Sequence, residues 1–397
     1  MKVLQINSVC GIRSTGRICT DIAEVLERHG HECKIAYGRE TVPEKYERFA
    51  VRIGNKHSVM LDALKTRLLD NAGFNSYRAT KRFLAWVKEY DPDIIHLHNI
   101  HGYYIHIGLL FEFLSSYGKP VVWTLHDCWP FTGHCAHYDF VGCDKWMSQC
   151  MDCPQLREYP GSLWRDRSRQ NHRHKTRLFN SVERLHFIAI SDWIAQQKEK
   201  SLLRDKPHIV IRNGIDLDVF RPMDSEFKKA HGITNKKVYL GVASFWGERK
   251  GFDAFLQLSQ MLDEDEIIVL VGLDAHQTQE LPANIIGIER TNSVRELAEI
   301  YTAADVFLNP TVEEGLGLVN IEAIACGTPV VTYQTGGSPE CVTEKSGKVV
   351  PKGDVQALLD AARSMRVDPL DLERDAARFD KNQKYREYLD FYKRCLG

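Results

Sequence analysis

Short apolar segments alternate with helical patterns along almost the whole chain, and this alternation most narrowly limits the fold. A first series of expected strands lies near residues 3–7, 32–37, 94–98, 121–125, 185–190 and 209–212. A second series follows near 238–243, 267–271, 285–288, 306–309, 330–333 and 348–350. Strands that alternate with helices form parallel sheets with helices on their faces. The sequence therefore predicts two successive α/β domains, each with a doubly wound parallel sheet.

The length of 397 residues fits this division, since one hydrophobic core rarely supports so long a chain. We expect one Rossmann-like domain at 1–213 and another at 214–380, with the boundary near Gly214–Pro222. The stretch from Val355 onward predicts two or three helices. The last, at 381–397, is amphipathic and could pack back on the first domain. Ligands of open α/β sheets bind beyond the carboxyl ends of the strands, so we expect the two domains to face each other across a ligand cleft.

Charge and hydropathy exclude several classes of function. The 52 Lys and Arg residues nearly balance the 53 Asp and Glu residues. No overall field therefore attracts nucleic acid or an anionic bilayer, and we expect no nucleic-acid partner. No run approaches the ~18 apolar residues of a membrane span, and the first residues lack the apolar region of a signal peptide. We expect a cytoplasmic protein.

A glycine-rich turn leads into an apolar helix between two carboxylates, Glu314 and Glu322. Glycine lets the backbone approach a ligand closely, and the first N–H groups of a helix can hold a diphosphate. We assign Gly317, Leu318 and Val319 to this contact. Glu314 can accept a hydrogen bond from a sugar hydroxyl, and Glu322 can accept one from a ribose diol. A solvated acidic helix start is the alternative, which the flanking small and apolar residues make less favoured.

Two further polar groups follow strand ends. His126 comes directly after the expected strand 121–125, on the rim of the expected cleft. A packed or solvated imidazole is the alternative. The adjacent cations Arg249 and Lys250 precede a glycine at a helix start, where they could neutralise a leaving diphosphate. Alone, this pair would more simply be solvated.

A glycine loop containing Gly16 opens the first helix after the first strand. It lacks the Lys and Ser/Thr of a Walker A motif, so its signal is weak. A phosphate contact at Gly16 and a tight turn capped by Ser14 or Thr15 are equally good interpretations.

Five of the eleven cysteines lie in a loop at 128–153. Cys135, Cys143, Cys150 and Cys153 are separated by seven, six and two residues. The last pair has zinc-knuckle spacing, and four thiolates satisfy a tetrahedral structural site that could hold a loop with little core of its own. The irregular upstream spacing keeps a metal-free loop open, and a redox role is less favoured.

These pieces, in this order, resemble glycosyltransferase family 4, the retaining enzymes of the GT-B fold, over nearly the whole chain. Four motifs carry the resemblance: the Glu314–Glu322 pair, the cations before Gly251, Asn213-Gly214-Ile215-Asp216 and Gly336-Gly337. Within the family, the run at 123–133, Trp-Thr-Leu-His-Asp-Cys-Trp-Pro-Phe-Thr-Gly, resembles the subgroup that builds colanic-acid-type exopolysaccharides and capsules.

The resemblance implies transfer of a hexose from a UDP- or GDP-sugar to a saccharide acceptor, which we expect to be linked to a polyprenyl diphosphate. It implies that His126 contacts the donor sugar, Lys250 the diphosphate, Glu314 the sugar hydroxyls and Glu322 the ribose. The leaving phosphate itself helps to deprotonate the acceptor in such enzymes, so we expect no catalytic metal. Many members carry an arginine where this chain has Ser244. Arg249 could supply that charge, or backbone N–H groups could.

Two other functions and one surface stay open. The same fold could serve a sugar-nucleotide epimerase or phosphorylase, or a non-catalytic saccharide-binding partner.

The segment Arg165–Arg177 contains six Arg or Lys residues and one acidic residue. This segment is either a solvated helix face or a contact with anionic headgroups at the inner face of the cell membrane.

Overall fold

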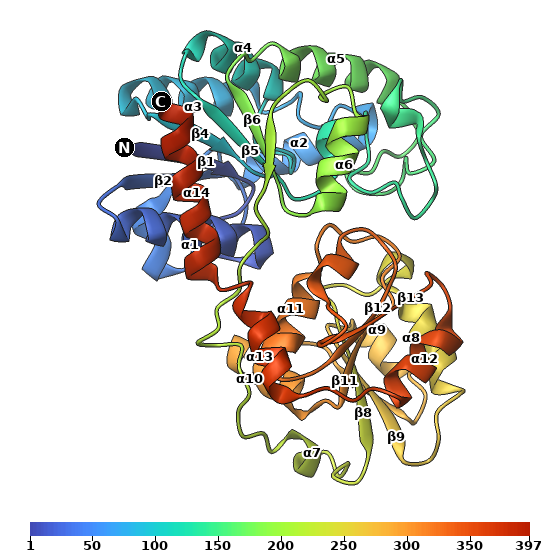
Figure 1. Ribbon diagram of the computed structural model, residues 1–397. Helices are drawn as coiled ribbons and strands as arrows, with labels where there is room; N and C mark the ends of the chain where they lie inside the picture. Colours follow the sequence, from blue (N-terminus) through green and yellow to red (C-terminus); the bar gives the residue numbers. More distant parts are fainter. The chain divides into compact units, whose positions relative to one another are not determined.

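The computed structural model describes residues 1–397, and the chain divides into two compact units (Figure 1). The first unit comprises Met1–Arg212 and Lys384–Gly397, and the second comprises Asn213–Gln383. Each unit is built on one sheet in which all strands run parallel. The predicted α/β class with two doubly wound parallel sheets and carboxy-terminal helices is confirmed.

The first sheet has seven strands in the order β3-β2-β1-β4-β5-β6-β7. The strands are β1 Lys2–Asn7, β2 Glu32–Tyr37, β3 Ala50–Arg52, β4 Ile94–Leu97, β5 Val121–Leu125, β6 Leu185–Ala189 and β7 His208–Val210. The helices are α1 Arg13–Arg28, α2 Lys56–Leu69, α3 Tyr77–Tyr90, α4 Ile107–Tyr117, α5 Ser168–Asn180, α6 Asp192–Lys200 and α14 Lys381–Leu396. The edge strand β3 was not predicted, because three partly exposed residues give too short a pattern to detect.

The core of the first unit includes the carboxy-terminal helix. Tyr385, Tyr388, Leu389 and Tyr392 of α14 are buried in one cluster with side chains of α1 and β2. Figure 1 shows α14, in red, running beside α1. Aromatic side chains bury large apolar areas, so this helix is an integral part of the first unit although it lies at the end of the chain.

The second sheet has six strands in the order β10-β9-β8-β11-β12-β13. The strands are β8 Lys237–Val242, β9 Glu266–Val271, β10 Ile285–Ile288, β11 Val306–Asn309, β12 Val330–Tyr333 and β13 Gly347–Val350. The helices are α7 Phe227–Ala230, α8 Phe252–Ser259, α9 Ala275–Gln279, α10 Val294–Ala303, α11 Leu318–Ala325, α12 Val355–Arg363 and α13 Pro369–Ala377. The strand order reverses between β8 and β11, and the loops that follow these neighbouring strands lie at the same sheet edge.

Candidate functional site

In the second unit, the loops after β8 and β11 bring Lys250 and Glu314 together. The Nζ atom of Lys250 forms an ion pair with Oε2 of Glu314, and the two side chains are 22% and 20% exposed. The other carboxylate oxygen of Glu314 accepts a hydrogen bond from the Gly315 N–H at 3.2 Å. The pair is therefore partly shielded from water but still open to a ligand. Their assignment to donor groups stays a prediction.

Two glycines hold the backbone of this loop. Gly251 has φ +77°, and a Cβ atom there would lie 2.3 Å from the Pro310 carbonyl oxygen. Gly336 has φ +51°, and a Cβ atom there would lie 1.9 Å from the Glu314 carbonyl oxygen. The Gly337 N–H donates to that same oxygen at 3.0 Å. Any larger residue at either glycine would displace the chain that carries Glu314.

Arg249 contacts the backbone of the same loop. Its guanidinium donates to the Glu313 carbonyl oxygen at 2.9 Å. Its own carbonyl oxygen accepts from the Val312 N–H at 2.9 Å and from the Thr311 hydroxyl at 3.1 Å. In this arrangement Arg249 holds the backbone of the loop that carries Glu314, and its role as a second cation for the diphosphate stays a prediction.

The start of α11 is uncapped by any side chain. Gly317, at φ +87°, is the residue before the helix, and Leu318 and Val319 form its first turn. The buried hydroxyl of Ser338 makes no hydrogen bond and lies 3.3 Å from the position that a Gly317 Cβ atom would occupy. Polar groups beside an uncapped helix start give this turn the character of an anion site.

Glu322 lies in the second turn of α11 and is half-buried. Its Oε2 atom accepts a hydrogen bond from the hydroxyl of Tyr301, on α10, at 3.1 Å. Tyr301 is fully buried, so its hydroxyl fixes the carboxylate. Sequence reasoning missed Tyr301 because it falls in the apolar pattern of α10 and its hydroxyl gives no separate signal.

In the first unit, His126 follows β5 and belongs to a chain of hydrogen bonds that begins at Gln5. The Nε2 atom of His126 is 3.0 Å from Nδ1 of His98, and Nε2 of His98 is 2.9 Å from Oε1 of Gln5. The amide nitrogen of Gln5 donates to the Cys19 carbonyl oxygen at 2.8 Å, which fixes Oε1 as the atom that faces His98.

This chain fixes the proton positions on both imidazoles. Oε1 of Gln5 can only accept, so His98 carries its proton on Nε2 and accepts at Nδ1. His126 must then donate from Nε2, and its Nδ1 atom is left as an acceptor. Sequence reasoning missed Gln5 and His98. Their signal was the presence of polar residues inside otherwise apolar strand segments.

Burial keeps these imidazoles neutral. The pKa of His126 is lowered to about 4, chiefly by burial; Asp127 acts in the opposite direction, and the neighbouring His101 adds to the lowering. Burial also holds the pKa values of His96 and His98 well below their usual range. At neutral pH His126 is therefore uncharged, and its imidazole can form a hydrogen bond with a ligand.

Asp127 is held by a second set of contacts. One of its oxygens lies 2.8 Å from Nε2 of His101, and the other accepts from the Trp129 N–H at 3.0 Å. The Nδ1 atom of His101 is 3.0 Å from the Tyr159 hydroxyl. Burial alone would raise the pKa of Asp127, but His101 overrides it and holds that pKa below its usual range. Tyr159 ties the far part of the long loop to the residues beside His126.

The glycine loop after β1 differs from the prediction. Helix α1 begins at Arg13, so Gly16 lies in its first turn, and the residue before the helix is Ile12. No side chain caps this end, so of the two interpretations the turn capped by Ser14 or Thr15 is wrong, and the phosphate contact at Gly16 stays a prediction. The early start, with Arg13 at φ +55°, moved the helix end away from both hydroxyls. A Cβ atom at Gly16 would lie 3.2 Å from the Gly11 nitrogen.

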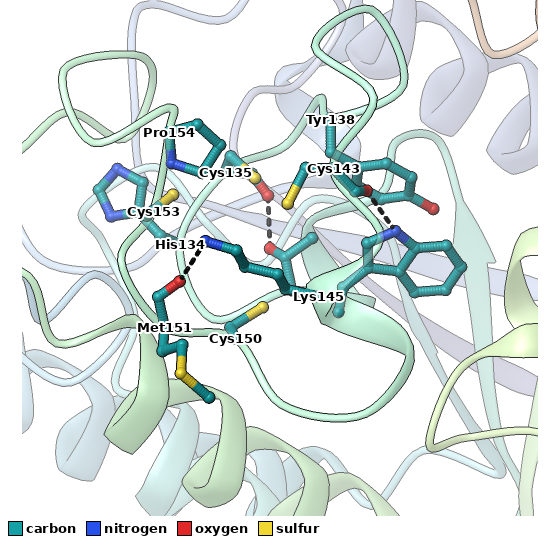
Figure 2. Close-up of a pocket in the computed structure, with 11 residues that line it drawn as sticks. His134, Cys135, Tyr138, Cys143, Lys145, Cys150, Met151, Cys153 and Pro154 are labelled. Carbon is teal, nitrogen blue, oxygen red and sulfur yellow. Dashed lines mark hydrogen bonds between the residues drawn. The ribbon is translucent and has the colours of Figure 1, made fainter.

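The cysteine loop and the basic segment lie next to each other. Cys135, Cys143, Cys150 and Cys153 line one pocket (Figure 2). No three His, Cys, Asp or Glu side chains are grouped closely enough to hold a metal ion. In the basic segment Lys175 is buried, whereas its arginines are largely exposed, so that segment is not a uniformly solvated face.

Comparison with known proteins gives the family. The model described as Glycosyltransferase Family 4 matches residues 15–219, and that described as Glycosyl transferases group 1 matches residues 236–368. The chain belongs to glycosyltransferase family 4. No helix of this glycosyltransferase is both long and apolar enough to cross a bilayer.

Relatives and solved structures extend this result. WcaC of Escherichia coli (strain K12), named for colanic acid biosynthesis, is 22% identical over 99% of both chains. The lipopolysaccharide core mannosyltransferase LpsB of Rhizobium meliloti (strain 1021) is 31% identical, over 44% of this chain and 55% of its own length.

The solved structures show the shared fold. Sucrose-phosphate synthase from Thermosynechococcus elongatus is 16% identical with a TM-score of 0.72, covering 99% of this chain and 98% of its own. Anabaena HepE, solved with UDP and glucose, is 16% identical with a TM-score of 0.67, covering 99% of both chains. The predicted GT-B fold is confirmed.

Proposed function

We propose that this glycosyltransferase moves a hexose, with retention, from a UDP- or GDP-sugar to a saccharide acceptor in cell-surface glycan biosynthesis. The observation that carries the proposal is the ion pair between Lys250, in the loop after β8, and Glu314, in the loop after β11 that leads to the uncapped start of α11. A cation, a carboxylate and free helix N–H groups are the chemistry that a sugar diphosphate needs.

The diphosphate lies on the N–H groups of Gly317, Leu318 and Val319 in this proposal. Lys250 then turns from Glu314 to the phosphates, because a phosphate carries more charge than a carboxylate. It stabilises the negative charge that grows on the leaving diphosphate. The released Glu314 carboxylate accepts from the hydroxyls of the transferred sugar.

Glu322 binds the ribose of the nucleotide. Tyr301 already donates to one of its oxygens, and the carboxylate retains acceptor capacity for a diol. Both nucleotides stay candidates, since HepE was solved with UDP and related mannosyltransferases are named for GDP-mannose.

His126 contacts the donor sugar from the first unit. Its Nδ1 atom is the acceptor that the Gln5–His98 chain leaves, so it accepts from a sugar hydroxyl. The acceptor hydroxyl attacks from the face that the diphosphate leaves. The leaving phosphate takes the proton, and the protein positions both substrates.

The acceptor is a lipid-linked saccharide at the inner face of the cell membrane. The names of WcaC and LpsB support a cell-surface glycan. Helix α2 exposes Met60, Leu61 and Leu64, and the Leu163 N–H donates to the Arg67 carbonyl oxygen at the end of that helix. Exposed apolar side chains flanked by basic ones fit an anionic bilayer surface.

Incubation with UDP-, GDP- and ADP-hexoses, with and without lipid-linked saccharides, tests the reaction. We expect acceptor-dependent release of UDP or GDP and a product with the anomeric configuration of the donor. Glu314→Gln is the inactive control. An isomerised donor would instead indicate an epimerase, and binding without turnover would indicate a non-catalytic partner.

Sedimentation with vesicles tests the membrane contact separately. We expect binding to phosphatidylglycerol vesicles, weaker binding to phosphatidylcholine vesicles, and loss of binding in Leu64→Glu. The matched control is Leu370→Glu, at an exposed leucine of the second unit. Equal binding of both variants would contradict the surface.

A further inference from the structure

The loop between β5 and α5, residues 126–167, has almost no regular structure. Only two short 3₁₀ turns interrupt it, at Trp129–Phe131 and Lys145–Met147. Loops this long are uncommon in compact domains unless they serve a function. The loop begins at His126 and includes Tyr159, so whatever orders it also orders the candidate site in the first unit.

Four cysteines of this loop meet at one pocket. Cys135, Cys143, Cys150 and Cys153 all line it, and Figure 2 shows their sulfur atoms around the same space. All four are free thiols in the structure. The four thiols are the ligand set of a structural tetrathiolate site, although no three of them lie close enough in the structure to hold an ion without moving.

A backbone donor already points at one of the sulfur atoms. The Gly133 N–H donates to Sγ of Cys150 at 3.2 Å. Hydrogen bonds from N–H groups favour the negative charge of a thiolate, and such donors surround the sulfur ligands of metal sites.

Two lysines supply compensating charge. Lys145 lines the same pocket and donates to the Met151 and Asp152 carbonyl oxygens at 3.1 and 2.9 Å. Lys175 of α5 is buried with its Nζ atom 3.4 Å from the Trp129 ring centroid, and it interacts electrostatically with Cys150. A divalent ion with four thiolates carries two negative charges, and nearby lysine side chains reduce the cost of placing that charge here.

One wall of the pocket is anchored to the rest of the unit. His134, which lines it, has its Nδ1 atom 2.5 Å from a carboxylate oxygen of Asp70, at the end of α2. The other oxygen of Asp70 accepts from the Arg167 N–H at 2.6 Å. The part of the lining that lies within residues 143–153 has only the Lys145–Met147 turn as regular structure.

We propose that Cys135, Cys143, Cys150 and Cys153 bind one structural Zn²⁺ ion, which closes the loop. Binding draws the thiols together from their positions in the structure to zinc–sulfur distances of about 2.3 Å and releases their protons. Zinc is the ion expected for a tetrahedral set of four thiolates that needs no redox chemistry. The proposal is independent of the reaction proposed above, because the ion holds the loop and touches no substrate.

Elemental analysis of the full chain, purified without a histidine tag and without chelator, tests the site. We expect about one zinc per chain, and X-ray absorption with only sulfur neighbours near 2.3 Å. Cys143→Ser and Cys150→Ser should each lose the zinc. Cys395→Ser, a buried cysteine of α14 far along the chain from the loop, is the matched control and should retain it.

If a variant fails to fold, two measurements on the wild-type chain still test the proposal. Titration with a mercurial reagent should release the zinc as the thiols react, and removal of zinc by a chelator should lower the unfolding temperature by about 5 °C or more. Wild-type protein without zinc, zinc retained by Cys150→Ser, or a Cys135–Cys153 disulfide in the purified protein would each overturn the proposal.

Discussion

The candidate sites of the two units are held in different ways. In the second unit, short loops after β8 and β11 carry Lys250 and Glu314. Glycines pack closely against the backbone beside these residues. In the first unit, His126 opens a long irregular loop and is fixed by hydrogen bonds between buried neutral side chains. Backbone packing and side-chain networks respond differently to mutation, pH and metal.

The two sites should therefore be disrupted by different changes. A backbone contact fails when a single Cβ atom is added, whatever the solvent. A network of neutral imidazoles fails when a proton is added, and a long loop fails when its crosslink is removed.

Gly336→Ala should have the largest effect. The added Cβ atom would meet the Glu314 carbonyl oxygen at 1.9 Å in a backbone conformation that alanine disfavours. We expect a loss of about 5 kcal/mol in the free energy of unfolding of the second unit, measured by denaturant titration. Gly353→Ala is the control, because Gly353 also has positive φ but an added Cβ meets nothing within 4 Å. Equal losses in both variants would show that the close approach is unimportant.

Lys250→Ala should follow. Removal of the ammonium leaves the leaving diphosphate without its cation, and we expect kcat to fall about 1000-fold, measured by nucleotide release. Lys250→Arg should recover part of the rate because it keeps the charge but not the shape. An active Lys250→Ala variant would contradict the proposed role of Lys250 in stabilising the leaving diphosphate.

Mild acid should weaken the first unit selectively. Folded His126 has a pKa of about 4 against 6.5 in an unfolded chain, so between these values unfolding takes up a proton and stability falls as pH falls. We expect His126 alone to contribute a loss of about 2 kcal/mol between pH 6.5 and 4.5, measured by hydrogen exchange, and His96 and His98, whose pKa values burial also lowers, act in the same direction. His134 opposes this in part, because Asp70 raises its pKa against the effect of burial.

The second unit supplies the comparison for this pH test. Burial would raise the pKa of Glu266, but Arg363 and Tyr239 lower it to about 2 from 4.5. The stability that Glu266 contributes is present above pH 4.5 and is lost as pH falls from there toward 2. Strands of the second unit should therefore stay protected at pH 5. Equal loss of hydrogen-exchange protection in both sheets at pH 5 would contradict the predicted difference between the two units.

Gln5→Glu should have a smaller, pH-dependent effect. A carboxylate beside Nε2 of His98 favours the doubly protonated imidazole, which would donate from Nδ1. His126 would then have to accept at Nε2 and would lose the acceptor at Nδ1. We expect activity to fall about 10-fold at neutral pH and to recover at higher pH. Nitrogen NMR of the imidazoles would show whether the proton positions change; unchanged tautomers would contradict the assignment.

Much of the fold could be predicted because buried parallel strands are short apolar runs between helices. The strand β3 escaped because its three residues are partly exposed. The Lys250–Glu314 contact could not be predicted, because the adjacency of β8 and β11 is a property of sheet order that the chain does not display. Gln5, inside β1, and His98, directly after β4, were missed because a polar residue in an apolar segment does not show which partner it meets.

The division between Glu314 and Glu322 tests the account most directly. Steady-state kinetics of each Glu→Gln variant, together with calorimetric titration of the free nucleotide, measures turnover and nucleotide affinity separately. Glu314→Gln should lower kcat about 100-fold and leave nucleotide affinity nearly unchanged. Glu322→Gln should weaken nucleotide binding about 10-fold and leave kcat nearly unchanged. Equal losses of both quantities in both variants would contradict the proposed placement of the sugar and the nucleotide.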